Sequence, residues 1–202
     1  GLCGVDCKTL RNFLSRKLHA ILMSTPCRKG AHELIELLRE AGVNLLAVDF
    51  DLTLVDIHTG GHWQRSAQEL VEHVRKTFRD LLPLALDASI HVAVVTFSPQ
   101  TELIRNVICE AFGQDVNRRV VVRGQDGSWC YKGNGDHNGK QAHIASAAQE
   151  IMRSTGCSIS RKTTLLIDDD MQNVQIALDN YVPAVLCKPD RPQDLERDIA
   201  ET

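Results

Sequence analysis

The sequence predicts an α/β fold, a doubly wound, Rossmann-like parallel sheet of five strands in the order 3-2-1-4-5 with helices on both faces. Short apolar runs rich in Val, Ile and Leu alternate with longer segments of helical periodicity. These runs are continuous rather than alternating with polar residues, which is typical of strands buried on both faces of a parallel sheet. Three of the runs end abruptly in polar residues, at the sheet edge where α/β proteins bind ligands.

Composition favours one globular domain with a short appendage, because 202 residues with 43% hydrophobic content can bury one sizeable core. The balance of 23 Lys and Arg against 26 Asp and Glu gives a net charge of -3, so we expect no nucleic-acid partner. No apolar run is long enough to span a bilayer and no secretory signal is recognisable, which favours a cytoplasmic location. The seven cysteines are odd in number and scattered, as expected for reduced, structural residues.

Residues 1–29 are predicted to form a basic amphipathic helical segment, and residues 30–202 the main domain. Apolar residues recur at helical spacing between residues 10 and 22. The segment contains six Lys and Arg residues and one acidic residue, Asp6. Such a helix either packs on the domain with its basic face in solvent or binds an acidic partner or a membrane surface. The oligomeric state is left open.

The first half of the domain is predicted to run helix, strand, loop, long helix, strand, helix. A helix over 31–40 ends at Gly42 and leads into an apolar strand that begins at residue 45. A Gly-containing loop over 56–63 precedes a helix from Ser66 to about residue 86, with Ser66 and Glu69 as a capping box. The second strand covers 91–98, and Pro99 introduces a helix over 100–112 that stops at Gly113.

The second half is predicted to contain three more strands and two more helices. The third strand covers 119–122 and is followed by a Gly-rich loop from Gly124 to Gly139, long enough to suggest a functional or mobile segment. Lys140 opens a helix that runs to about residue 153. The fourth strand, 163–167, leads into three consecutive Asp residues, a helix over 171–180, a fifth strand over 182–187 and a charged tail.

The polar residues that follow the strands are the candidate site. Asp49 and Asp51 follow the first strand, Thr96 ends the second, and Asp168 and Asp169 follow the fourth. In the order 3-2-1-4-5 the first and fourth strands are neighbours, so Asp49 and Asp168 are expected to face each other. Carboxylates crowded into one pocket repel one another and raise one another's pKa, and a bound divalent cation would compensate their charge. Because all the ligands would be oxygen atoms, we expect the cation to be Mg²⁺. The alternative for residues 168–170 is a cap on the following helix.

The chain resembles the haloacid dehalogenase superfamily in four motifs. The stretch 49–53, Asp-Phe-Asp-Leu-Thr, resembles the first motif, Asp-x-Asp-x-Thr after a hydrophobic strand. Val94-Val95-Thr96 resembles the second, Lys140 at a helix start the third, and Leu166-Ile167-Asp168-Asp169 the fourth. The motifs occur in the family's order over roughly residues 43 to 187.

The resemblance implies a phosphatase chemistry. Asp49 would be the nucleophile, and Asp51 the general acid and base that is typical of phosphoryl-transferring members. Asp49, Asp168 and the backbone carbonyl of Asp51 would hold Mg²⁺, with Asp169 ordering metal-bound water or Lys140. Thr96 and Lys140 would hydrogen-bond the phosphoryl oxygens. Two features depart from the family pattern. Ser98 is an alternative to Thr96 as the hydroxyl residue of the second motif. The three consecutive Asp residues allow two registers of the fourth motif, and we assign it to Asp168 and Asp169.

Substrate choice in this superfamily depends largely on an inserted cap, and here the insertions are only the 58–63 and 124–139 loops. We therefore expect an open site that suits a bulky or protein phosphate monoester, although a small metabolite covered by a partner subunit is an alternative. His58, His62 and Trp63 are candidates for the entrance, with core packing as the alternative for Trp63. The predicted function is a Mg²⁺-dependent phosphatase. A phosphomutase or other phosphotransferase is one alternative, and a catalytically silent binding module is another.

Overall fold

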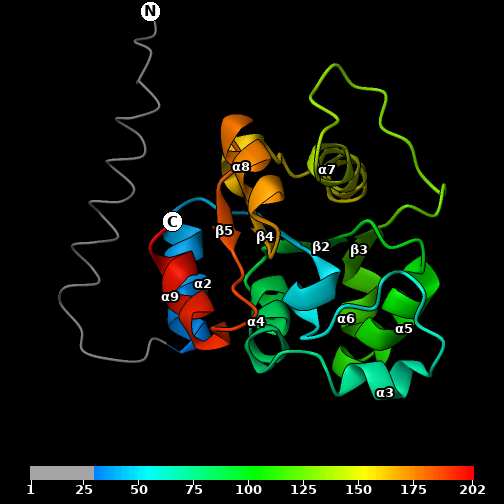
Figure 1. The fold of residues 1–202 in the computed structure, drawn as a ribbon. Coiled ribbons are helices and arrows are strands. Elements are labelled where there is room, and N and C mark those ends of the chain that lie inside the picture. Colours follow the sequence, from blue (N-terminus) through cyan, green and yellow to red (C-terminus); the bar gives the residue numbers. More distant parts are fainter. Residues whose placement is uncertain (1–29) are drawn as a thin grey trace, which may run out of the picture.

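The computed structural model describes residues 30–202, and it has the predicted fold (Figure 1). Five parallel strands form one sheet in the order β3-β2-β1-β4-β5. The predicted helical segment over 1–29 lies outside the described residues. The strands are β1 (Leu45–Val48), β2 (His91–Val95), β3 (Val120–Arg123), β4 (Thr164–Asp168) and β5 (Ala184–Leu186).

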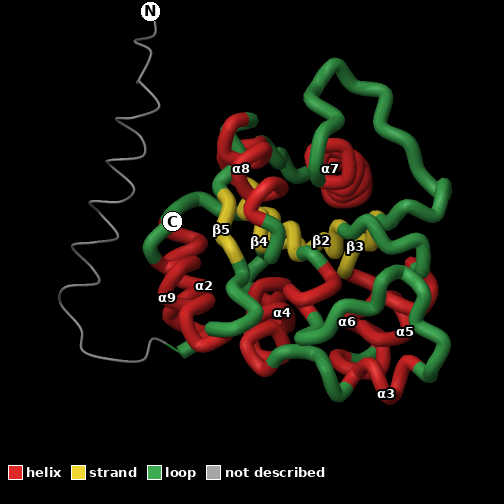
Figure 2. Tube along the Cα trace, in the orientation of Figure 1, coloured by secondary structure: helices red, strands yellow, loops and turns green. Residues whose placement is uncertain are grey.

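Helices cover both faces of the sheet (Figures 1 and 2). One face carries α7 (Gln141–Thr155) and α8 (Met171–Asp179), and the other α2 (Ala31–Glu40), α4 (Lys76–Asp87) and α5 (Thr101–Phe112). Successive β1 side chains belong to opposite cores: Leu46 and Val48 pack with α2 and α4, whereas Leu45 and Ala47 pack with α7. Both faces of β1 are therefore apolar, which explains the continuous apolar run in its sequence.

The long helix predicted from Ser66 to residue 86 is wrong, because the chain forms two helices there. α3 (Ala67–Val71) begins with the predicted capping box, and α4 starts again at Lys76. Between them Val74 forms an antiparallel bridge with Val55. Arg75 has extended backbone and its side chain donates to the carbonyls of Leu52 and Thr53. These contacts to a distant segment replace the helical hydrogen bonds that local propensity favours.

Other differences are small and lie at element ends. The structure adds two short helices, α6 (Gln114–Arg119) and α9 (Leu195–Ala200), and α9 packs on α2 within the predicted charged tail. β2 ends at Val95, so the hydroxyls that follow it stand in a loop. Gly42 and Gly113 have φ of 80° and 89°, which supports their predicted role at helix ends.

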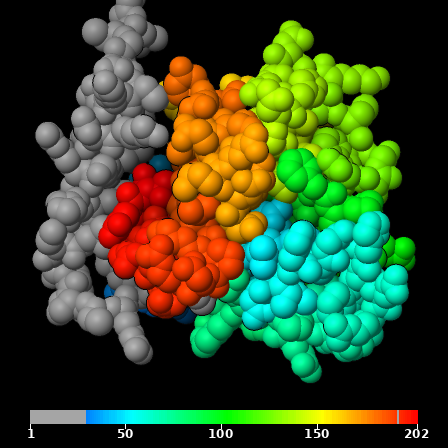
Figure 3. All heavy atoms as spheres, in the orientation of Figure 1, coloured from blue at the N-terminus to red at the C-terminus, as the bar shows by residue number. Residues whose placement is uncertain are grey.

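The strand register places the candidate site at one sheet edge. Val48 pairs with Val94 on one side and with Ile167 on the other, so Asp49 stands beside Asp168 at the carboxyl ends of the strands. In the space-filling view the cyan residues that follow β1 lie beside the orange residues of α8 and the C-terminal segment (Figure 3). None of the helices within residues 30–202 is long and apolar enough to cross a membrane.

Candidate active site

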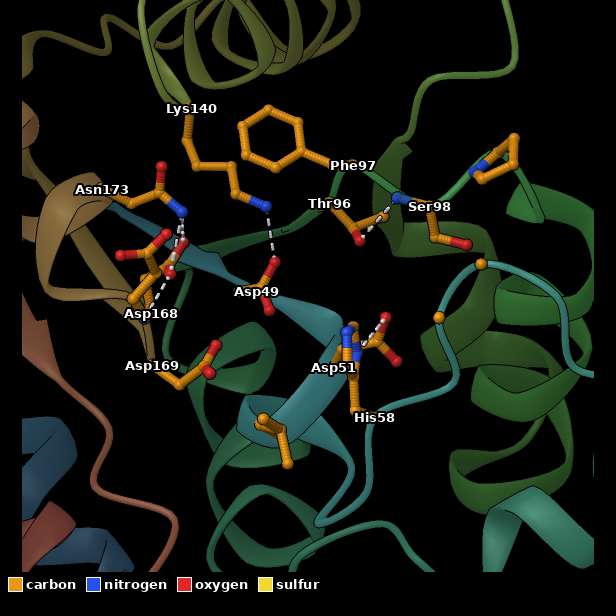
Figure 4. A pocket seen from close by; sticks show the side chains of 15 residues that line it. Asp49, Asp51, His58, Thr96, Phe97, Ser98, Lys140, Asp168, Asp169 and Asn173 are labelled. Carbon is orange, nitrogen blue, oxygen red and sulfur yellow. Dashed lines mark hydrogen bonds and ion pairs between the residues drawn. The ribbon is translucent and has the colours of Figure 1, made fainter.

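One pocket of about 390 Å³ brings together all the catalytic and metal-binding residues that the sequence predicted (Figure 4). It opens at the carboxyl ends of β1, β2 and β4. Its lining includes Asp49, Asp51, Thr96, Lys140, Asp168 and Asp169. Residues more than 100 positions apart in the chain therefore share one small volume.

Asp49 and Lys140 form a buried ion pair at the floor of the pocket. The Asp49 backbone N–H donates to the Ile167 carbonyl at 2.9 Å, which fixes the residue against β4. Lys140 precedes the first turn of α7, and its Nζ donates to Asp49 Oδ1 at 2.6 Å and to the Val95 carbonyl at 3.2 Å. Only 5% of Asp49 and 2% of Lys140 is exposed. Burial raises the pKa of Asp49 to about 7, although Lys140 opposes the shift.

Asp168 and Asp169 bring two more carboxylates to Asp49. Ligand oxygens from the three residues lie within 4.8 Å of one another, the one such acidic, His or Cys group within residues 30–202. Burial also raises the pKa of Asp168 and of Asp169. Hard oxygen donors at this spacing fit a divalent cation such as Mg²⁺, which would relieve the cost of burying them together.

The three consecutive Asp residues have different partners, which bears on the register of the fourth motif. Asp168 accepts from Asn173 Nδ2 at 3.1 and 3.2 Å and from the Asp170 N–H at 2.9 Å. Asp170 accepts from the Gln172 N–H at 2.8 Å and caps α8. The capping interpretation thus holds for Asp170, while Asp168 and Asp169 face Asp49.

Asp51 lies apart from this triad, on the side of the pocket nearer His58 (Figure 4). It belongs to η1 (Phe50–Leu54), a single wide turn in which Leu52 has a positive φ of 57°. Its carboxylate accepts from the Thr59 N–H at 2.9 Å and lies 3.4 Å from His58 Nδ1. The turn separates the two carboxylates of the first motif, so that only Asp49 is in the acidic triad.

Thr96 and Ser98 both line the pocket and both are buried. Thr96 Oγ1 accepts from the Ser98 N–H at 3.1 Å, and Ser98 Oγ accepts from the Gln100 N–H at 3.2 Å. Each hydroxyl keeps its own proton to donate. The structure therefore keeps both residues as candidates for contacting an oxygen ligand.

The 56–63 loop contributes less to the pocket than the sequence suggested. His58 lines it, together with Gly60 and Gly61, but His62 and Trp63 do not. Trp63 packs against the core and its Nε1 donates to the Ser66 carbonyl at 3.0 Å. The packing alternative is therefore the correct one for Trp63.

Two residues at the site had no signal in the sequence. Arg75 holds the turn after Asp51 through hydrogen bonds of 3.0 Å to the carbonyls of Leu52 and Thr53. Phe97 lines the pocket, with Lys140 Nζ 4.0 Å from the centre of its ring. Arg75 fell inside a predicted helix and Phe97 inside a predicted strand, so neither pattern pointed to a ligand.

No protein-family model matches this chain, and no curated protein matches it.

Proposed function

We propose that this chain is a Mg²⁺-dependent phosphatase of the haloacid dehalogenase type, hydrolysing a phosphate monoester through an aspartyl-phosphate on Asp49. The observation that carries this proposal is the buried Lys140–Asp49 pair, which lies beside two further carboxylates at the ends of parallel strands. Burying such a set is costly unless a cation compensates the charge, and buried carboxylates with perturbed pKa values in a pocket are typical of functional sites. A cytoplasmic location, expected from the sequence, belongs to the same proposal.

Asp49, Asp168 and Asp169 would hold the metal, with the backbone carbonyl of Asp51 as the further ligand expected from the first motif. Their clustered carboxylate oxygens, which are hard donors, suit Mg²⁺. When bound, Mg²⁺ would offset negative charge on the carboxylates and on the phosphoryl group, so that an anionic nucleophile can approach.

The protein side chains divide the chemistry between two steps. In the first, an Asp49 oxygen attacks phosphorus, the ester P–O bond breaks, and Asp51 gives its proton to the leaving oxygen. In the second, Asp51 takes a proton from water, which attacks the phosphorus of the aspartyl-phosphate and releases phosphate and free Asp49. Lys140 and the Thr96 hydroxyl would stabilise the phosphoryl oxygens during both steps.

The separation of Asp51 from the triad supports its role in proton transfer. Its carboxylate is engaged by the Thr59 N–H and lies near His58, rather than beside Asp168 and Asp169. It therefore lines the pocket without being one of the clustered carboxylates. A group in this position can hold a proton for the leaving oxygen while the metal occupies the triad.

The loops near the site bear on the alternatives. The 56–63 loop contributes His58, Gly60 and Gly61 to the pocket lining, whereas no residue of 124–138 lines the pocket. The described chain forms neither helix nor strand over 56–65 or 124–138. A phosphomutase generally needs an enclosed site that keeps water from the phosphoenzyme, so hydrolysis is the better fit.

The direct test is phosphate release from a panel of phosphate monoesters and phosphopeptides, with Mg²⁺ and with a chelator. Asp49→Asn should abolish release, whereas Asp80→Asn, an exposed residue on α4 outside the pocket, should keep wild-type turnover. The proposal fails if Asp49→Asn keeps more than a small fraction of wild-type turnover, or if no ester is hydrolysed under any condition.

A further inference from the structure

The floor and the outer part of the pocket differ in chemistry. Five Asp residues and Lys140 line the pocket as a whole. The apolar side chains in the lining are those of Leu52, Phe97 and Pro99. Lys140 is the single Lys or Arg in that lining, and it is already paired with Asp49. The bound phosphate and the metal would use the floor, which leaves the apolar side chains for the rest of the substrate.

This charge distribution restricts the leaving group. A second phosphate or a carboxylate would meet Asp51 and Asp170 without a spare permanent cation to pair with. Unpaired anions this close to carboxylates are repelled, and the cost rises as water is excluded. The alcohol that leaves should therefore be uncharged, which disfavours bisphosphates and other esters whose leaving group carries a second phosphate.

Phe97 is the most prominent apolar group at this site. Its residue is 41% exposed, one of three large hydrophobic residues that are exposed within 30–202; the others are Met171 and Tyr181. Phe97 directly follows Thr96, and Lys140 Nζ lies 4.0 Å from its ring centre. An aromatic ring left partly in water beside a reactive pair is suited to contact a substrate.

Two further rings hold Phe97 in place. His143 on α7 packs edge-on against it, with ring centres 5.4 Å apart and an interplanar angle of 82°. Trp129 in turn packs against His143, with ring centres 4.7 Å apart. His143 is 6% exposed and neither of its ring nitrogens has a hydrogen-bond partner among the described residues, so it serves here as an aromatic spacer.

The aromatic series joins the 124–139 loop to the reactive floor. Trp129 Nε1 donates to the Gly124 carbonyl at 2.7 Å, which ties the ring to the start of the loop. From there the contacts pass through His143 and Phe97 to Lys140. The loop thus contacts Phe97 indirectly, through Trp129 and His143.

We infer that Phe97 is a specificity-determining residue that contacts an uncharged aromatic leaving group, so that the substrates are phosphate esters of ring-bearing alcohols. This inference rests on the proposed phosphatase function. The shared chemistry covers free aryl phosphates and the phosphotyrosine side chain of a protein. His143 and Trp129 are positioning residues that keep the Phe97 ring at the pocket.

The test compares benzyl phosphate with ethyl phosphate in excess Mg²⁺. Both release a primary alcohol, so the ratio of their kcat/KM values reports recognition of the ring and cancels general effects on Lys140. The wild-type protein should prefer benzyl phosphate by roughly 3- to 10-fold, the range expected for one aromatic contact. Phe97→Ala should bring the ratio close to one, whereas Phe97→Tyr should retain it.

Tyr181→Ala is the matched control, because Tyr181 is an exposed aromatic residue outside the pocket lining. It should leave the ratio at the wild-type value. Phe97→Leu, which keeps an apolar side chain without a ring, gives a second variant; it should fall below Phe97→Tyr. Thermal melts of each variant establish that it is folded.

The outcomes separate this inference from the proposed function. Asp49-dependent hydrolysis of both esters with a wild-type ratio near one, or a ratio unchanged in Phe97→Ala, overturns the inference and leaves the phosphatase standing. Hydrolysis of neither ester overturns both. Phenyl phosphate and a phosphotyrosine peptide then distinguish the sources: a higher kcat/KM for the peptide indicates a protein substrate, and a higher value for the free ester a small molecule.

Discussion

Asp49 and Asp51 are two positions apart, yet their carboxylates have different surroundings. Asp49 is buried against Lys140, whereas Asp51 accepts from the Thr59 N–H and lies near His58. The sequence predicted that both belong to the site because both follow an apolar strand. The strand pattern could not predict these different surroundings, since the partners of Asp51 come from the loop that follows the η1 turn.

The different surroundings predict different effects of two substitutions. Asp51→Asn should keep Mg²⁺ affinity nearly unchanged and slow turnover by roughly 10² to 10⁴, the usual cost of losing a general acid and base. Asp168→Asn should weaken Mg²⁺ binding first, because Asp168 belongs to the acidic triad. The measurement is a Mg²⁺ titration of turnover on an aryl phosphate and on a phosphopeptide.

An aryl ester needs less protonation of its leaving oxygen, so the Asp51→Asn defect in forming the phosphoenzyme should be smaller on that substrate. Loss of metal binding in Asp51→Asn, with normal binding in Asp168→Asn, would reverse the assigned roles.

His143 makes a prediction about the effect of pH on stability. Burial, with smaller contributions from the charges of Lys140 and Arg123, lowers the pKa of His143 to about 4. The unfolded chain takes up this proton near the ordinary pKa of about 6.5 and the folded chain does not, so the free energy of unfolding falls as pH drops through this window. His143 therefore lowers the free energy of unfolding by about 3 kcal/mol near pH 4 and has no such effect above pH 7.

His143→Phe removes the titrating group and keeps a ring between Phe97 and Trp129. Its stability advantage over the wild type should therefore grow as pH falls from 7 to 4, measured by urea unfolding. His62→Phe, at an exposed position, serves as the control. A constant difference between His143→Phe and wild type across this range would show that His143 does not titrate as described.

At the scale of elements, the strands were the most predictable part of the chain. Strands buried on both faces produce continuous apolar runs, and the alternation of strands and helices predicted a parallel, doubly wound sheet. The structure confirms the expected strand order. The break between α3 and α4 was not predictable, because the residues there have ordinary helical propensity. It is fixed by the Val55–Val74 bridge and by Arg75, contacts between segments about 20 residues apart.

Arg75 should therefore contribute measurably to the stability of the η1 turn. Arg75→Met removes two hydrogen bonds to the carbonyls of Leu52 and Thr53, and we expect a loss of about 1–3 kcal/mol in the free energy of unfolding. Arg39→Met, which removes an exposed ion pair with Glu36, should cost less than about 1 kcal/mol. Equal losses in the two variants, measured by urea unfolding, would argue against a structural role for Arg75.

At the scale of the whole molecule, strand order alone brought most of the site together. Asp49 and Asp168 follow neighbouring strands, so their proximity could be predicted from the strand order. Lys140, which contacts Asp49, was placed there only by its resemblance to the third motif. Phe97 and its ring contacts could not, because they depend on how the 124–139 loop returns to α7. The net charge of -3 likewise gave no sign of the local acidic cluster.

This cluster predicts that Mg²⁺ stabilises the folded protein. Metal that binds the folded state and not the unfolded one increases the free energy of unfolding by mass action, by about 2.7 kcal/mol at one hundred times its Kd, and so raises the melting temperature. Asp168→Asn should largely lose this gain, whereas Asp170→Asn, at the α8 cap, should keep it. Identical wild-type melts with Mg²⁺ and with a chelator would contradict a metal site at the triad.

The central claim is that phosphate passes through a covalent bond to Asp49. The most direct measurement is an acid quench during turnover of a phosphate monoester, followed by peptide mass spectrometry. The wild-type protein should carry the mass of one phosphoryl group on Asp49, and Asp51→Asn should accumulate more of it if breakdown is slowed more than formation. Phosphate attached to a different residue, or turnover with no covalent phosphate under conditions that preserve an acyl phosphate, would contradict the mechanism.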